Sequence, residues 1–337
     1  MSALQIIWFG LIAVLLVGYA ILDGFDLGVG FWHLLARQEG TRRTFLTAIG
    51  PFWDGNEVWL LTAGGALFAA FPPVYATVFS GFYLALVVVL AALILRAVSL
   101  EWRAREATAA ARNRWDVVFA LCSIVATLLF GVAFGNILHG LPLDRVGNFT
   151  GAFFSLLNPF AVLIGLVNCA MLATHGALYL SLRTRGELAA QTRTWALRAW
   201  WTYLPLALVA VIAAIATQPH LLRNYIALPA LWLLPALALL AILLIGRFTA
   251  RGQAAPAFAA SAAGIALLLI AAAAGLFPTL VPALGHPAWN LTVMDSSSPL
   301  TLTVMLIITF IGMVLVAIYT TWVYRTFSGP VQVDDHY

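Results

Sequence analysis

The chain has 337 residues, of which 63% are hydrophobic and 9% are charged. Because an average soluble domain has about 25% charged residues, this composition excludes a soluble globular protein and indicates an all-α polytopic membrane protein. The 17 basic residues are all arginines in short clusters between apolar runs, so the net charge of +4 reflects membrane orientation and indicates no nucleic-acid partner.

A bilayer core about 30 Å thick needs roughly 20 apolar residues at a rise of about 1.5 Å per residue. By that measure the sequence predicts nine transmembrane helices and no separate soluble domain. The predicted spans cover residues 5–34, 53–71, 75–98, 116–138, 153–181, 200–218, 225–246, 255–282 and 300–324. The first span lacks the basic leader and small-residue cleavage site of a signal peptide, so we expect it to be retained.

Arginines mark one side of this predicted membrane domain. They follow the odd-numbered spans as Arg37, Arg42 and Arg43; Arg103, Arg105, Arg112 and Arg114; Arg183, Arg185, Arg193 and Arg198; Arg247 and Arg251; and Arg325. The other side has Arg145 and Arg223 alone. The positive-inside rule therefore predicts an outward N-terminus and a cytoplasmic C-terminal sequence, VQVDDHY.

Prolines and polar segments interrupt the apolar runs. Pro72 and Pro73 are expected to form the outer turn between the second and third spans. Four further prolines fall inside predicted spans and are expected to bend them: Pro159, Pro205, Pro229 and Pro235. Residues 99–115 and 183–199 mix Arg, Glu, Ala and Trp, which predicts short interfacial helices or helix extensions.

Four carboxylates stand in the strongly apolar stretches 18–30 (GYAILDGFDLGVG) and 50–65 (GPFWDGNEVWLLTAGG). Asp23 and Asp26 are three residues apart, as are Asp54 and Glu57, so each pair lies on one face of a helix. An ionisable side chain in a membrane span costs several kcal/mol unless it faces protein or water. The four acids, all in the predicted cytoplasmic half, therefore indicate ion or proton handling.

Arg96 is the arginine that lies well inside a hydrophobic run, LAALILRAVSL. Its depth near the inner end of the third span matches that of Asp54, and a tight turn makes the second and third spans neighbours. We therefore predict that Arg96 pairs with Asp54, with Glu57 as the alternative partner. A charged partner holds one carboxylate ionised while an unpaired neighbour binds a proton, and such a graded set can pass protons.

Structural roles compete with this interpretation. Asp54 followed by Glu57 resembles a capping box, so Asp54 is alternatively an N-cap of the second span. Asp23 and Asp26 are mid-helix, where no cap is needed. Gly24 and Gly28 have GxxxG spacing on a different face, which predicts that the first span packs against protein on more than one side.

Other chemistry-bearing residues have simpler interpretations. His175 is deep in a span and is interpreted as a hydrogen-bonded core residue, because a haem or metal would need a second ligand at matching depth. We therefore expect no haem and no metal on this chain. Cys122 and Cys169 are interpreted as small buried hydrophobes. Trp53 and Trp59 are interpreted as packing or interfacial aromatics rather than a quinone site.

Six segments also resemble a known family. They are LDGFDLGVG (22–30), GPFWDGNEVWLLTAGGALFAAFP (50–72), FSGFYLAL (79–86), GVAFGN (131–136), LLNPFA (156–161) and SSPLTLTVM (297–305). Together they are similar to subunit II of the bd-type quinol oxidases, the group that includes the cyanide-insensitive oxidases. The matches run in order through almost the whole chain, and the WDGNEVWL block is the most specific of them.

The resemblance implies nine helices arranged as two four-helix bundles plus one helix, bound to a similarly built subunit I. Subunit I would carry haem b and haem d and oxidise quinol, while subunit II carries no haem. The complex would reduce oxygen to water electrogenically, taking protons from the cytoplasm without pumping. In the family, the residue matching Asp54 is associated with the cytoplasmic mouth of a proton path and that matching Asp26 lies nearby, whereas Glu57 is an amide in some members.

The resemblance also implies the lipid of a bacterial cytoplasmic (inner) membrane as the surroundings, and in some members a very small single-helix third subunit. Quinone or lipid bound to this subunit is left open. Two other functions compete with proton delivery: a proton-coupled secondary transporter and a structural scaffold with incidental acids. A transporter would be expected to spread its polar determinants over both halves of the chain, but the last five predicted spans have no internal carboxylate.

Overall fold

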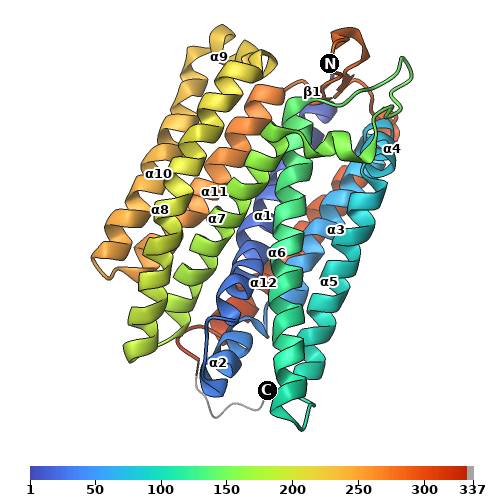
Figure 1. The fold of residues 1–337 in the computed structure, drawn as a ribbon. Helices are drawn as coiled ribbons and strands as arrows, with labels where there is room; N and C mark the ends of the chain where they lie inside the picture. Colours follow the sequence, from blue (N-terminus) through green and yellow to red (C-terminus); the bar gives the residue numbers. More distant parts are fainter. Residues whose placement is uncertain (332–337) are drawn as a thin grey trace.

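Long apolar runs form helices in this protein because a helix satisfies every interior backbone hydrogen bond within one segment. The computed structural model describes residues 1–331. Its long helices lie along one common direction (Figure 1). They are α1 (Ala3–His33), α3 (Trp53–Ala70), α5 (Tyr83–Arg103), α6 (Ala109–His139), α7 (Pro159–Arg183), α8 (Gly186–Thr217), α10 (Leu233–Ala250), α11 (Ala254–Leu276) and α12 (Pro299–Thr326).

Short elements join the long helices. They are α2 (Glu39–Ile49), α4 (Pro72–Gly81), α9 (Arg223–Ala227), the 3-10 helices η1 (Phe153–Leu157), η2 (Pro219–Leu222), η3 (Pro229–Trp232) and η4 (Pro287–Trp289), and the antiparallel strands β1 (Thr279–Val281) and β2 (Leu291–Thr292). The helix α2 lies at one end of the bundle, which we call the α2 end. The strand β1 and helix α9 lie at the opposite end, the β1 end (Figure 1).

Within residues 1–331, eight helical segments are long and apolar enough to cross a membrane. This finding confirms an all-helical, multi-span membrane protein. The helix α3 is the long helix that falls outside these eight. Its first turns carry Asp54, Asn56 and Glu57, which lower its hydropathy.

Helix boundaries correct part of the proline prediction. Pro159 and Pro229 begin α7 and η3 rather than bending a span. Proline is favoured at a first helical position because it has no backbone N–H, and an N–H at that position would have no partner within the helix. Pro205 lies inside α8, and Pro235 lies in the first turn of α10. The arginine-rich segments 99–115 and 183–199 mostly continue the long helices α5, α6 and α8.

The first helix is the centre of the packing. It contacts α3, α6, α7, α11 and α12, and it lies between α6 and α7 in Figure 1. A side chain at Gly28 would lie 2.1 Å from the Leu172 carbonyl oxygen and 2.8 Å from Gly176 on α7. This close approach confirms that the glycine face of α1 packs against protein, and it leaves the acid-bearing face for α3 and α5.

Further helix contacts fall into two groups. The helices α3, α5 and α6 are linked to α1 directly or through one another, while α7, α8, α10 and α11 contact one another. The last helix α12 packs on α3 and α1 and is otherwise largely exposed. Its exposed side chains are mostly apolar, so this surface suits lipid or another subunit.

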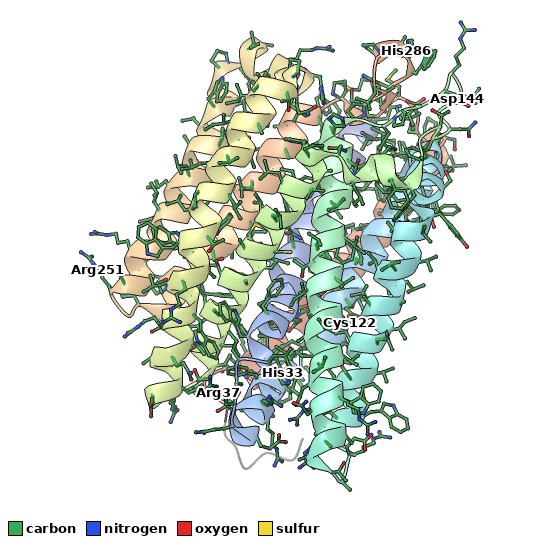
Figure 2. All side chains as sticks on the ribbon, in the orientation of Figure 1. His33, Arg37, Cys122, Asp144, Arg251 and His286 are labelled. Atoms are coloured by element: carbon green, nitrogen blue, oxygen red, sulfur yellow. The ribbon has the colours of Figure 1, made fainter. Side chains whose placement is uncertain are left out.

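The two ends of the bundle differ in charge and construction. Figure 2 shows His33 and Arg37 near the α2 end, and Asp144 and His286 near the β1 end. At the β1 end the loop after α6 binds the chain after α11, because the Leu141 N–H donates to the Pro282 carbonyl at 2.8 Å. This loop contact joins the ends of α6 and α11, which are far apart in the chain.

Candidate functional site

A buried arginine joins two of the predicted acids. The Arg96 side chain on α5 is 0% exposed, and its Nη1 donates to Glu57 Oε1 at 2.7 Å while Nη2 donates to Asp23 Oδ1 at 3.1 Å. The expected pairing of Arg96 with Asp54 is therefore wrong, and the alternative partner Glu57 is confirmed. Glu57 lies one turn further into α3 than Asp54, at the level that the guanidinium reaches while it also bonds α1.

Asp26 is fully buried on α1, one turn after Asp23. Its Oδ2 accepts a hydrogen bond from Asn56 Nδ2 at 2.7 Å, while Oδ1 has no hydrogen-bond partner within residues 1–331. The described residues place no basic side chain within ion-pair distance of Asp26. Of the two aspartates on α1, Asp23 thus faces a cation and Asp26 faces a neutral amide.

Asp54 lies apart from these contacts. It is exposed near the start of α3 and makes no hydrogen bond or ion pair to the residues that the structure describes. The N-cap of α3 is Phe52, which has no side-chain cap bond, so the predicted capping role of Asp54 is wrong. Asp54 is the second residue of the helix, where a negative charge is favoured by the helix dipole.

Exposure therefore rises in order along the acids of this site. Asp23 and Asp26 are fully buried, the Glu57 side chain is 22% exposed, and Asp54 is exposed at the α2 end of α3. Asp54 and Glu57 share one face of α3, and Glu57 shares Arg96 with Asp23. This arrangement connects the surface at the α2 end with the interior of the bundle through titratable groups.

A second buried charge cluster lies nearer the α2 end and was not predicted. Asp116 on α6 is fully buried and accepts from His33 Nε2 at 2.5 Å, from Arg42 Nη1 at 2.9 Å and from Arg103 through both carboxylate oxygens. Arg103 also donates to Glu39 at 2.9 Å. These contacts join α1, α2, α5 and α6.

Sequence position hid this second cluster. Asp116 is the first residue of a predicted span and follows several arginines, so it resembles an ordinary interfacial acid. The spacing of the residues could have indicated this cluster in the sequence. Arg103 follows Arg96 by seven residues on α5, and His33 follows Asp26 by seven residues on α1. Seven residues are about two helical turns, so both clusters lie on the same faces of the same two helices, about 10 Å apart along the axis.

The remaining chemistry-bearing residues are structural. His175 bonds Ser261 Oγ at 2.9 Å and the Ile21 carbonyl at 3.0 Å and stacks on Phe258, which confirms its interpretation as a hydrogen-bonded core residue. A side chain at Gly18 would collide with the Trp59 ring, which supports a packing role for that tryptophan.

The two cysteines are free and only partly buried. Within residues 1–331, no group of three or more His, Cys, Asp or Glu side chains has the arrangement of a metal site.

The fold and the buried charges define a class: polytopic α-helical membrane proteins with ionisable groups inside the bundle. Residues 4–327 match the family described as cytochrome bd terminal oxidase subunit II. The chain belongs to this family, and the resemblance found in its motifs is confirmed. It is therefore a subunit of a membrane-bound respiratory oxidoreductase complex, in which subunit I is the partner and the haems lie mainly on subunit I.

Relatives match over nearly the full length. The probable cytochrome oxidase subunit 2 of Haemophilus influenzae is 41% identical over 98% of this chain and 96% of that protein. The cytochrome bd-I ubiquinol oxidase subunit 2 of Escherichia coli strain K12 is 38% identical over 99% of this chain and 97% of that protein. A solved structure of bd oxidase from Geobacillus thermodenitrificans shares the fold, with a TM-score of 0.81 at 18% identity over 97% of this chain and 99% of that chain.

Proposed function

We propose that this chain is the haem-free subunit II of a bd-type quinol:oxygen oxidoreductase, and that it conducts protons towards the oxygen-reduction site of subunit I and supports assembly of that subunit. The observation that carries this proposal is the graded set of acids around Arg96. The set runs from exposed Asp54 through half-buried Glu57 to buried Asp23 and Asp26.

Charge balance assigns different roles to the two buried aspartates. Arg96 supplies one positive charge to Asp23 and Glu57, and Asp26 has a neutral partner. An uncompensated buried carboxylate is costly, so the buried group without a cation is the one that binds a proton. Asp26 is therefore the group that binds the proton. Asp23 and Arg96 form an ion pair next to it.

The proposed route begins at Asp54. An exposed carboxylate on a membrane helix needs water or protein in contact with it. Asp54 is the second residue of α3, which follows α2 directly, and Arg42 and Arg103 meet at this α2 end. By the positive-inside rule that end would lie in the cytoplasm and the N-terminus outside. Protons would enter at Asp54, pass Glu57 and reach Asp23 and Asp26 before leaving for subunit I.

The membrane topology belongs to the same proposal. With α3 as the ninth span, the chain crosses the membrane an odd number of times, as opposite locations of its two ends require. The helices α1, α3, α5 and α6 would form one four-helix bundle and α7, α8, α10 and α11 the other, with α12 as the additional helix. The membrane is the cytoplasmic (inner) membrane of a bacterium.

Subunit I completes the catalytic unit in this proposal. It would carry haem b and haem d and oxidise quinol, so this chain would have no redox centre of its own. The reaction would be electrogenic, because protons cross part of the membrane to reach the haems, and it would not pump. A very small third subunit is compatible with this arrangement. Family membership and the lack of internal carboxylates in the last five predicted spans disfavour the transporter alternative.

The test uses the complex purified through a tag on this chain. Co-purification of b-type and d-type haem in the absorption spectrum is the expected result for the wild type. In Asp26→Asn, the spectrum should persist while oxygen consumption falls about 10-fold or more, as expected for loss of a proton-transfer group. Glu187→Gln, an exposed acid at the start of α8, is the matched control. Full activity in a haem-replete Asp26→Asn complex would exclude proton conduction through Asp26.

A further inference from the structure

The two oxygens of the Asp26 carboxyl group have unlike surroundings. Oδ2 accepts a hydrogen bond from Asn56 Nδ2 at 2.7 Å. Oδ1 is buried and has no partner within the described residues 1–331. A proton on Asp26 therefore has two chemically different sites.

The orientation of the Asn56 amide decides between them. Asn56 is buried at the start of α3, and its Nδ2 also donates to the Leu22 carbonyl at 3.2 Å. A carbonyl oxygen only accepts, so the amide nitrogen must be on that side, and a flipped amide would place two oxygens against each other. Both N–H groups of the amide are thus committed, one to Leu22 and one to Asp26.

The opposite side of the amide is fixed from the last helix. The Tyr324 hydroxyl on α12 donates to Asn56 Oδ1 at 3.1 Å. Its ring lies against Phe52, with the ring centroids 4.5 Å apart. Tyr324 therefore holds the amide oxygen pointing away from Asp26. Tyr324 and Asn56 make this contact although they are 268 positions apart in the chain.

We propose that Asn56 and Tyr324 are positioning residues that place the exchangeable proton of Asp26 on Oδ1. The amide N–H beside Oδ2 donates best to the carbonyl-type oxygen of a protonated carboxyl group, so it favours the hydrogen of a protonated Asp26 on Oδ1. That oxygen is the one without a partner, so its proton is not held by a competing acceptor. The inference rests on the proposed function, since it specifies how Asp26 takes up and releases a proton.

Loss of Tyr324 should weaken this selectivity. Without its hydroxyl group, only the Leu22 carbonyl opposes rotation of the Asn56 amide. An amide that turns its oxygen towards Asp26 would accept a hydrogen bond from Oδ2 of the protonated carboxyl group. The proton would be held in that bond rather than remain available on Oδ1. Donation from Asn56 to the ionised carboxylate would also weaken, which favours the protonated form.

Other groups around Asp26 stay in place in this test. The titratable and charged side chains that act on it are Asp23 of α1, Glu57 of α3, Arg96 of α5, Tyr179 of α7 and Tyr324 of α12. Tyr179 donates to the Ala48 carbonyl and not to Tyr324, so its hydrogen bond does not depend on the Tyr324 hydroxyl group.

The experiment compares Tyr324→Phe with the wild-type complex. Tyr319→Phe is the matched control, because Tyr319 is on the same helix with its side chain 53% exposed. The readouts are oxygen consumption against pH and the infrared carbonyl band of a protonated carboxyl group, assigned to Asp26 by its loss in Asp26→Asn. We expect the alkaline limb of the pH profile in Tyr324→Phe to move upward by about 0.5 to 1 pH unit, the size of one hydrogen bond, and the band to shift.

Haem spectra establish assembly before either readout is interpreted. If Tyr324→Phe does not assemble, Asn56→Leu, which removes the hydrogen bond to Oδ2, should shift the band and move the pH profile in the same direction. An unchanged band and profile in an assembled Tyr324→Phe or Asn56→Leu complex would overturn the inference. Failure of the proposed function is a different result: full oxygen consumption in Asp26→Asn.

Discussion

Asp26 and His33 stand seven residues apart on α1, and each belongs to a different buried cluster. Asp26 has a neutral amide partner, whereas His33 is bonded to an aspartate that also accepts from two arginines. The cluster around Asp116 compensates its charges internally and ties four helices together. The cluster around Arg96 contains more carboxylates than cations. It is therefore suited to bind protons and not only to stabilise the helix packing.

Replacing Arg96 by leucine should prevent normal assembly. It leaves Asp23 and Glu57 without their cation, and breaking a buried ion pair by removing one partner costs about 3–5 kcal/mol. The haem content recovered with tagged subunit II and the thermal midpoint of the complex measure the loss. Adding Asp23→Asn should restore part of it, because the uncompensated charge is gone. Strictly additive losses in the double variant would show that the two side chains do not interact.

Asp116→Asn should destabilise the complex without a specific effect on proton transfer. The variant removes the shared acceptor of His33, Arg42 and Arg103 and leaves buried cations uncompensated, a loss of about 3–5 kcal/mol. Thermal unfolding of the complex measures it, with Glu187→Gln as the exposed control. The rate per assembled haem should remain near wild type. A normal thermal midpoint would mean that the cluster contributes little to stability.

Gly28→Ala should separate α1 from α7. A methyl group there would lie 2.1 Å from a backbone carbonyl oxygen, and backbone atoms cannot move aside as a flexible side chain can. We expect little or no haem-bearing complex to be recovered from membranes. Gly10→Ala on the same helix is the matched control, because nothing lies within 4 Å of its added methyl group. Equal yields from the two variants would contradict the close helix contact.

The loop at the β1 end has a predictable pH dependence. Hydrogen bonds from the side chain and backbone N–H of Asn148 lower the pKa of Asp144 below its usual value. A carboxyl group with a lowered folded-state pKa contributes stability above its unfolded pKa of about 3.9 and loses that contribution as pH falls through the folded pKa. The difference in thermal midpoint between the wild type and Asp144→Asn should therefore be constant above about pH 4 and shrink below it. A difference that grows with acidity would contradict this assignment, and Arg145→Gln serves as the neighbouring control.

The sequence predicted the helical membrane fold and the acids of the site, because hydropathy and the presence of carboxylates in apolar runs are local properties. It could not predict which acid Arg96 selects, since that depends on how α3 is rotated against α1 and α5. Asp54 and Glu57 lie on one face, and only packing shows that the second of them reaches the guanidinium.

Contacts between distant segments also could not be predicted from the sequence. Nothing in the sequence around Asn56 or Tyr324 indicates that these residues touch. Their contact depends on α12 returning to α3 after the six intervening long helices have been placed. The cluster around Asp116 was missed for a related reason. Arginines near a span boundary indicate orientation, and the convergence of two of them on one buried carboxylate requires α2 to fold back on α6.

Time-resolved proton uptake tests the central claim most directly. The fully reduced complex, reconstituted in vesicles, is mixed with oxygen, and the uptake of protons from the side of the α2 end is followed with a pH-sensitive dye. We predict that Asp26→Asn slows this uptake about 10-fold or more while leaving the haem spectrum intact. Uptake at the wild-type rate and from the same side in Asp26→Asn would contradict a proton route through the buried acids of this subunit.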